Sequence, residues 1–128
     1  MREMRAMCFG EAEVLKALIA RAQKSREKLP NGQVTLDLIP DDPPIIRLIF
    51  TDDYGRREII ERDPVDVAAA LVGHCIDRRI RLPANASKFV DIIDGNVALL
   101  IYMDERDAVR QAMRRPRVRP ARKAASES

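Results

Sequence analysis

The chain has 128 residues, of which 46% are apolar and 34% charged; this suits one folded domain and is too short for two ordinary ones. Three Phe, two Tyr and no Trp leave few aromatic faces for stacking on bases or sugars. No apolar run approaches the roughly 20 residues of a membrane-spanning helix, and the N-terminal residues lack the apolar core of a signal peptide. We therefore expect a cytoplasmic protein.

The net charge of +3 is unevenly distributed along the chain. Residues 1–107 carry 16 Lys/Arg and 19 Asp/Glu, a balance of −3, whereas residues 108–128 carry seven basic residues and one acidic residue, a balance of +6. The second stretch is rich in Pro, Arg, Ala and Ser and cannot bury enough apolar surface to offset the entropy of ordering it. The sequence thus predicts an N-terminal segment over 1–10, a single globular domain over 11–107 and a basic, largely disordered tail over 108–128.

An amphipathic helix is predicted over residues 11–28, ending before the Pro30-Asn31-Gly32 turn. Its apolar side chains recur at three- and four-residue spacing, which places on one face Val14, Leu15, Leu18, Ile19 and Ala22. The Met-rich residues 1–10 are interpreted as a segment that could extend this helix.

Three strands are predicted over residues 33–39, 45–51 and 57–61, joined by short turns into an antiparallel meander. The first alternates apolar and polar residues with a period of two, as a half-buried strand does. The turns contain two pairs of aspartates, Asp41-Asp42 and Asp52-Asp53. Aspartates in turns usually accept hydrogen bonds from their own backbone, so we do not expect a metal or acid–base site there.

The clearest local signal is Asp63-Pro64, a capping residue followed by a proline at the first helical position. The helix is predicted to run to about Arg79. Its expected buried stripe comprises Val65, Ala68, Leu71, Val72, Cys75 and Ile76. His74 is then expected at the surface or edge of the helix and Cys75 inside as an inert thiol, because adjacent helical residues do not face each other.

A hairpin is predicted over residues 88–93 and 97–103 around the turn Asp94-Gly95-Asn96. Because residues 97–103 are apolar on both faces, they should form a central strand covered on both sides by helices or by a partner. A short last helix is expected from Asp104 through Arg115. These elements predict an α+β fold of order α-β-β-β-α-β-β: a two-layer sandwich of two main helices on a mostly antiparallel sheet of about five strands.

No catalytic, metal or cofactor site is predicted. Cys8 and Cys75 are far apart in the sequence and suit two reduced thiols rather than a disulfide framework. With one histidine and two distant cysteines, the chain has no zinc-ligand spacing, and it has no glycine-rich phosphate loop.

The basic residues near the C-terminus are the candidate site. Arginine forks match phosphate and carboxylate oxygens, so we expect these residues to contact an anionic partner: Arg106, Arg110, Arg114, Arg115, Arg117, Arg119, Arg122 and Lys123. A second, smaller basic cluster at the end of the helix from Pro64 comprises Arg78, Arg79 and Arg81.

The sequence supports three hypotheses of function. The first is a non-enzymatic protein-binding or adaptor module that binds a protein partner or self-associates, with the basic tail contacting an anionic partner. The second is a nucleic-acid-associated regulatory protein, whose affinity would fall with salt. The third is a small enzyme with an unrecognised site. Binding to a membrane surface is not expected, because one basic stretch without a lipid anchor binds weakly.

Overall fold

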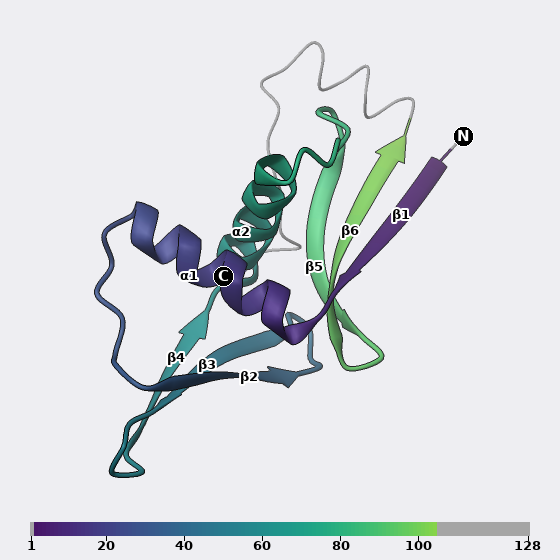
Figure 1. Ribbon diagram of the computed structural model, residues 1–128. Helices are drawn as coiled ribbons and strands as arrows, with labels where there is room; N and C mark the ends of the chain where they lie inside the picture. Colours follow the sequence, from purple (N-terminus) through teal and green to yellow (C-terminus); the bar gives the residue numbers. More distant parts are fainter. Residues whose placement is uncertain (1, 105–128) are drawn as a thin grey trace.

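The computed structural model describes residues 2–104, which form six strands and two helices (Figure 1). In chain order these are β1 (Arg2–Phe9), α1 (Glu11–Lys24), β2 (Gln33–Ile39), β3 (Ile45–Thr51), β4 (Arg57–Arg62), α2 (Pro64–Asp77), β5 (Ser87–Ile93) and β6 (Asn96–Asp104). The α+β class is confirmed. The short helix expected through Arg115 and the tail over 108–128 lie outside the described residues.

The strands form two three-stranded antiparallel sheets, so the prediction of one sheet of about five strands is wrong. Sheet A has the order β1-β6-β5 and sheet B the order β2-β3-β4. The predicted meander is sheet B, and the predicted hairpin is β5 and β6 of sheet A. Figure 1 shows the two sheets at a steep angle to each other, with α1 and α2 filling the space between them.

The N-terminal segment is a strand, and its interpretation as a helical extension is wrong. β1 pairs along its whole length with β6, from Arg2 opposite Asp104 to Phe9 opposite Val97. Met and Ala favour helices locally, but pairing with an apolar central strand outweighs that weak preference. The register places Met7 and Phe9 toward the core and the alternate residues toward the opposite face.

Helix α1 is shorter than predicted because its last turn is closed early. The Ser25 hydroxyl donates to the carbonyl oxygens of Arg21 and Ala22, at 3.2 and 3.1 Å. Arg26 then adopts a positive φ of 58°, and the Glu27 N–H donates to the Ala22 carbonyl at 2.9 Å. This pattern ends the helix at Lys24, before the Pro30-Asn31-Gly32 turn is reached.

Helix α2 begins as predicted, but it buries a different face. Asp63 Oδ1 accepts the Val65 N–H at 2.9 Å, and Pro64 occupies the first turn. Val65 and Ile76 are 36% and 65% exposed instead of buried. The reason is that α1 packs against the side of α2. The buried face of α2 therefore includes three residues that the predicted stripe omitted: Val67, Ala70 and His74.

One hydrophobic core joins both sheets and both helices. Its largest fully buried side chains include Ile46 and Leu48 from β3, Leu71 from α2, and Leu99 and Ile101 from β6. β6 is the central strand of sheet A, as predicted. Among the described elements, however, the helices cover only the face of sheet A that carries Leu99 (Figure 1).

Candidate functional site

The face of sheet A that points away from the helices is largely apolar, and we call it the open face. The strand registers place alternate residues of each strand on this side, four in β1, five in β6 and four in β5. They are Arg2, Met4, Ala6 and Cys8 of β1, Asn96, Ala98, Leu100, Tyr102 and Asp104 of β6, and Ser87, Phe89, Asp91 and Ile93 of β5. Of these thirteen residues three are charged: Asp91, and the register partners Arg2 and Asp104 at one end.

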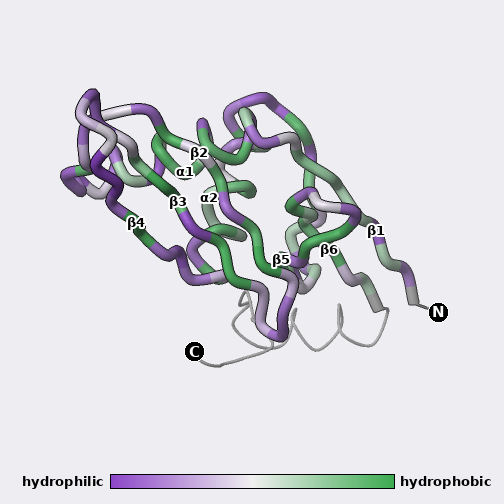
Figure 2. The backbone as a smooth tube through the Cα atoms, turned by 90° about the horizontal axis from the view of Figure 1, so that it is seen from below, coloured by the Kyte–Doolittle hydropathy of each residue, from purple (hydrophilic) through white to green (hydrophobic). Residues whose placement is uncertain are grey.

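Several side chains of the open face are accessible. Met4 is 60% and Tyr102 is 43% exposed, while Phe89 and Leu100 are half-buried and Ala98 is fully buried. The rings of Phe89 and Tyr102 pack edge to face with centroids 5.7 Å apart. Figure 2 shows that hydrophobic residues run along β6, whereas β4 in sheet B is largely hydrophilic. The result is an apolar surface held in a fixed arrangement by the strands.

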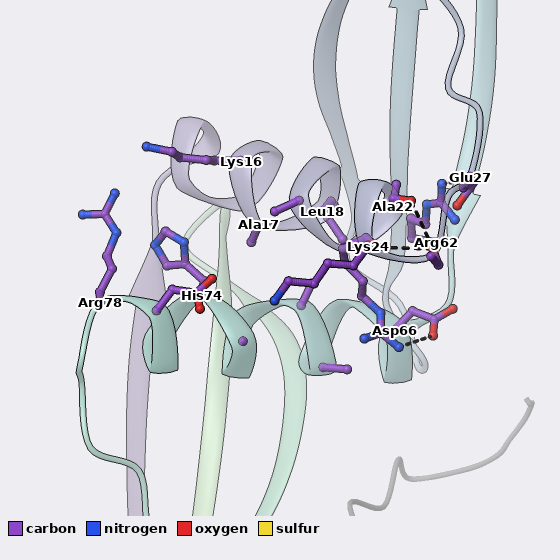
Figure 3. A pocket seen from close by; sticks show the side chains of 17 residues that line it. Lys16, Ala17, Leu18, Ala22, Lys24, Glu27, Arg62, Asp66, His74 and Arg78 are labelled. Atoms are coloured by element: carbon purple, nitrogen blue, oxygen red, sulfur yellow. Dashed lines mark hydrogen bonds and ion pairs between the residues drawn. The ribbon is translucent and has the colours of Figure 1, made fainter.

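A second feature is an interhelical cleft of about 670 Å³ between α1 and α2 (Figure 3). Small residues of both helices line it, and five cations surround it: Lys16, Arg21, Lys24, Arg62 and Arg78. Two of these cations are paired at distances of 2.6 and 3.5 Å, Arg62 with Glu27 and Arg21 with Asp66. The other three form no ion pair with the carboxylates of residues 3–103.

His74 lies at one end of the cleft and is buried, so its predicted place at the helix surface is wrong. Its side chain is 7% exposed, and Nε2 forms no hydrogen bond with the described residues. The nearest carboxylate oxygen is Glu13 Oε2, at 3.6 Å. Glu13 also accepts the Gly10 N–H through Oε1, at 3.4 Å. Figure 3 shows Lys16 and Arg78 at the same end as His74.

Gly73 lines the cleft from the interior of α2 and has no structural reason to be glycine. A Cβ added there would meet no described atom within 4 Å, and the backbone is that of an ordinary helix. Glycine inside a helix costs about 1 kcal/mol relative to alanine. The position therefore keeps open a space that a larger side chain would fill.

The secondary basic cluster is only partly associated with the cleft. Arg78, Arg79 and Arg81 follow the last turn of α2 and are all exposed, but only Arg78 lines the cleft. The basic residues of the candidate site near the C-terminus lie outside the described residues: Arg106, Arg110, Arg114, Arg115, Arg117, Arg119, Arg122 and Lys123. Their expected role stays a prediction.

The cysteines and turn aspartates lie as predicted. Cys75 is buried, and its burial, with a smaller effect of Glu13, raises the pKa of the thiol above its ordinary value of 9.0. Cys8 is exposed and also free. Asp52 Oδ1 accepts the N–H groups of Tyr54 and Arg56, both at 2.9 Å. Across residues 2–104, no group of three or more His, Cys, Asp or Glu side chains is arranged to hold a metal ion.

Comparison with protein-family models, curated proteins and solved structures finds no match to this chain. Neither helix of the described part has the length and apolar character needed to cross a membrane.

Sequence reasoning missed both the open face and the cleft. To predict the open face one must know that β1 is a strand, because Met4, Ala6 and Cys8 form part of that face. Residues 6–9 are a short continuous apolar run, which suits a buried strand or a buried helix segment equally well, so the sequence pattern did not identify the strand. To predict the cleft one must know which face of α2 packs against α1. Gly73, the glycine inside α2 beside His74, was the only local sign of the cleft in the sequence.

Proposed function

We propose that this protein is a self-associating, non-enzymatic binding module. Two copies associate through their open faces, and the basic C-terminal segment contacts an anionic partner. The observation that carries the proposal is the apolar, accessible surface formed by β1, β6 and β5. Contiguous apolar patches on folded proteins commonly mark interaction surfaces.

The composition of the open face favours a second copy as its occupant. In a two-fold symmetric dimer the same patch meets itself, so every charge on it faces the same set of charges. Its charged residues are Asp91 on the edge strand β5 and the register partners Arg2 and Asp104 at one end. Two such faces can therefore meet with little repulsion while burying Leu100 and the aromatic pair of Phe89 and Tyr102.

The size of the face limits how tightly two copies can associate. Three strands of about seven residues span roughly 10 by 24 Å between strand axes, using the standard strand spacing and rise. Standard stable interfaces bury about 800 Å² per partner, which is more than such a face offers. We therefore expect weak, concentration-dependent association, with a Kd on the order of 100 μM.

Sedimentation velocity of the full chain, in reducing buffer from about 10 μM to 1 mM, tests this proposal. The weight-average sedimentation coefficient of the wild-type protein should rise with concentration. Tyr102→Lys and Met4→Lys place a charge on the open face at accessible positions, so both variants should remain monomeric. Ile59→Lys is the matched control, because Ile59 is 54% exposed on the outer face of sheet B.

Two results would overturn self-association through this face. One is a wild-type protein that stays monomeric up to 1 mM, which would leave the open face to a different partner. The other is a loss of association in Ile59→Lys equal to that in Tyr102→Lys. In that case a general charge effect, and not the open face, would govern association.

The second half of the proposal is that the basic segment, residues 108–128, binds an anionic partner through its charge. It rests on the sequence balance of −3 over residues 1–107 and +6 over residues 108–128. Exposed charges are screened within about a nanometre at physiological ionic strength, so a partner bound through this segment should dissociate as salt is added. Association through the largely apolar open face should respond weakly to the same salt.

A further inference from the structure

The interhelical cleft contains two features that folding alone does not explain. Gly73 gives up helix stability without being required by a close contact or an unusual backbone angle. His74 buries an imidazole nitrogen with no hydrogen-bond partner among the described residues. Buried polar atoms are normally satisfied, and an unsatisfied one often marks a site whose partner is absent. The two residues are adjacent and both line the cleft.

The charge around the cleft indicates what kind of partner would fit. After the pairs Arg21–Asp66 and Arg62–Glu27, the lining retains three cations and one carboxylate. The cations are Lys16, Lys24 and Arg78, and the carboxylate is Asp77. Glu13 lies beside His74, with its Oε2 atom 3.6 Å from Nε2. The unpaired residues that line the cleft thus include more cations than carboxylates, which favours an anion.

We propose that the interhelical cleft binds a small phosphate-bearing molecule, held by Lys16, Lys24, His74 and Arg78. A phosphate group carries up to two negative charges and several acceptor oxygens, which matches two ammonium groups, a guanidinium and an imidazole. A cleft of about 670 Å³ is large enough for a small metabolite and lies within the usual range of ligand sites. Gly73 has no side chain and so leaves free space beside the alanines that line the cleft.

This proposal is independent of self-association. The cleft lies between the helices, on the side of sheet A opposite to the open face (Figures 1 and 3). A failure of one proposal therefore leaves the other intact.

The single histidine of the chain gives a direct readout. The C2–H proton of His74 is the only signal of its kind in the NMR spectrum, so it reports on the cleft without labelling. Full-length protein is titrated with inorganic phosphate and with pyrophosphate at constant ionic strength, using chloride as the reference anion. We expect saturable shifts of the His74 signal with both phosphates, tighter with pyrophosphate, and no saturable shift with chloride.

Variants of the cleft separate specific binding from general attraction. Gly73→Leu fills the space while improving helix propensity, so it should remain folded and lose the saturable shift. Lys16→Gln and Arg78→Gln should each weaken binding roughly fivefold, the upper range for exposed charge pairs. Gly73→Ala, which adds one methyl group, and Arg57→Gln, which removes an exposed cation on β4, are the controls and should bind like wild type.

Three results would overturn the proposal. The first is a His74 shift that does not saturate, and the second is an unchanged pyrophosphate affinity in folded Gly73→Leu. The third concerns the source of the phosphate: a short single-stranded oligonucleotide is titrated in parallel. If the oligonucleotide shifted the His74 signal and pyrophosphate did not, the cleft would be a nucleic-acid contact and not a site for a small ligand.

Discussion

Sheets A and B are built alike and differ in what their outer faces meet. Each has three antiparallel strands and one face in the shared core. On the outer face of sheet B, Arg47 bridges all three strands through Asp37 and Glu61, at 3.9 and 3.6 Å. On the outer face of sheet A, the corresponding central positions of β6 are Ala98, Leu100 and Tyr102.

This difference shows that the order of apolar and polar residues along a strand distinguishes a sheet face exposed to water from a sheet face that contacts other elements or molecules. A strand beside water alternates apolar and polar residues, as β2 does over Gln33–Leu38. A strand that is apolar at consecutive positions has no side assigned to water, as in β6. Sheet A therefore has the composition of a sheet enclosed on both sides, although the described helices enclose one.

The largest effect should come from a charge on the inner side of β6. Leu99 is fully buried in the core, whereas its neighbour Leu100 is half-buried on the open face. Leu99→Asp should cost at least about 4 kcal/mol and leave the domain unfolded, because it buries an unpaired carboxylate. Leu100→Asp should cost less than about 2 kcal/mol and remain folded, since its side chain can reach water.

Circular dichroism and urea unfolding of the two variants check this contrast. A folded Leu99→Asp would mean that the inner face of sheet A is not the core. If Leu100→Asp unfolded as completely as Leu99→Asp, the monomer itself would require cover on the open face, and that face would belong to the interior of the protein.

A smaller effect is expected in sheet B, where a glycine permits a close backbone approach. Gly32 has a φ of +119°, and a Cβ there would lie 2.2 Å from the Thr51 carbonyl oxygen. Gly32→Ala should cost about 2–3 kcal/mol, because the paired ends of β2 and β3 must separate. Gly55→Ala is the control: its φ of +81° costs about 1–2 kcal/mol, with no atom within 4 Å. Equal midpoints in urea would contradict the close approach.

The sequence was sufficient for the elements whose signals are local. Three predictions that depend only on neighbouring residues are confirmed. They are the helix cap at Asp63 and Pro64, the alternation in β2 and the turn at Asp94-Gly95. The turn has the positive φ values at Asp94 and Gly95 that a tight hairpin requires.

Elements defined by distant partners could not be predicted in this way. β1 is a strand because residues nearly a hundred positions later pair with it, and the buried face of α2 is set by where α1 packs. The candidate sites depend on both, since the open face needs β1 and the cleft needs the two helices together. The predicted basic residues from Arg106 to Lys123 lie beyond the described residues, so the sequence alone supports them.

The last prediction compares a cation on each sheet. Lys88 of β5 is 7% exposed on the inner side of sheet A and donates from Nζ to the carbonyls of Pro83 and Ala86, at 2.9 and 3.2 Å. Desolvation by burial lowers the pKa of this ammonium group below its ordinary value of 10.5. Arg47 of sheet B keeps its charge beside water and two carboxylates.

A lowered pKa has a definite consequence for stability. Between the folded pKa of Lys88 and 10.5, the unfolded chain binds more protons than the folded one, so the free energy of unfolding rises with pH in this window. Cys75 acts in the opposite direction above pH 9.0, because its raised pKa makes the folded state hold its proton longer. The test is therefore a difference between proteins, in which the contribution of Cys75 cancels.

Urea unfolding of wild type, Lys88→Met and Arg47→Met from pH 7 to 10.5 measures that difference. The stability of wild type relative to Lys88→Met should rise with pH in the alkaline range, because only wild type recovers the cost of a buried ammonium group as it deprotonates. The difference between wild type and Arg47→Met should stay within about 1 kcal/mol across this range, since ion pairs of a partly exposed side chain contribute little to stability. A flat difference for Lys88→Met would mean that water reaches Nζ, and that the edge of sheet A beside Pro83 is more open than its packing indicates.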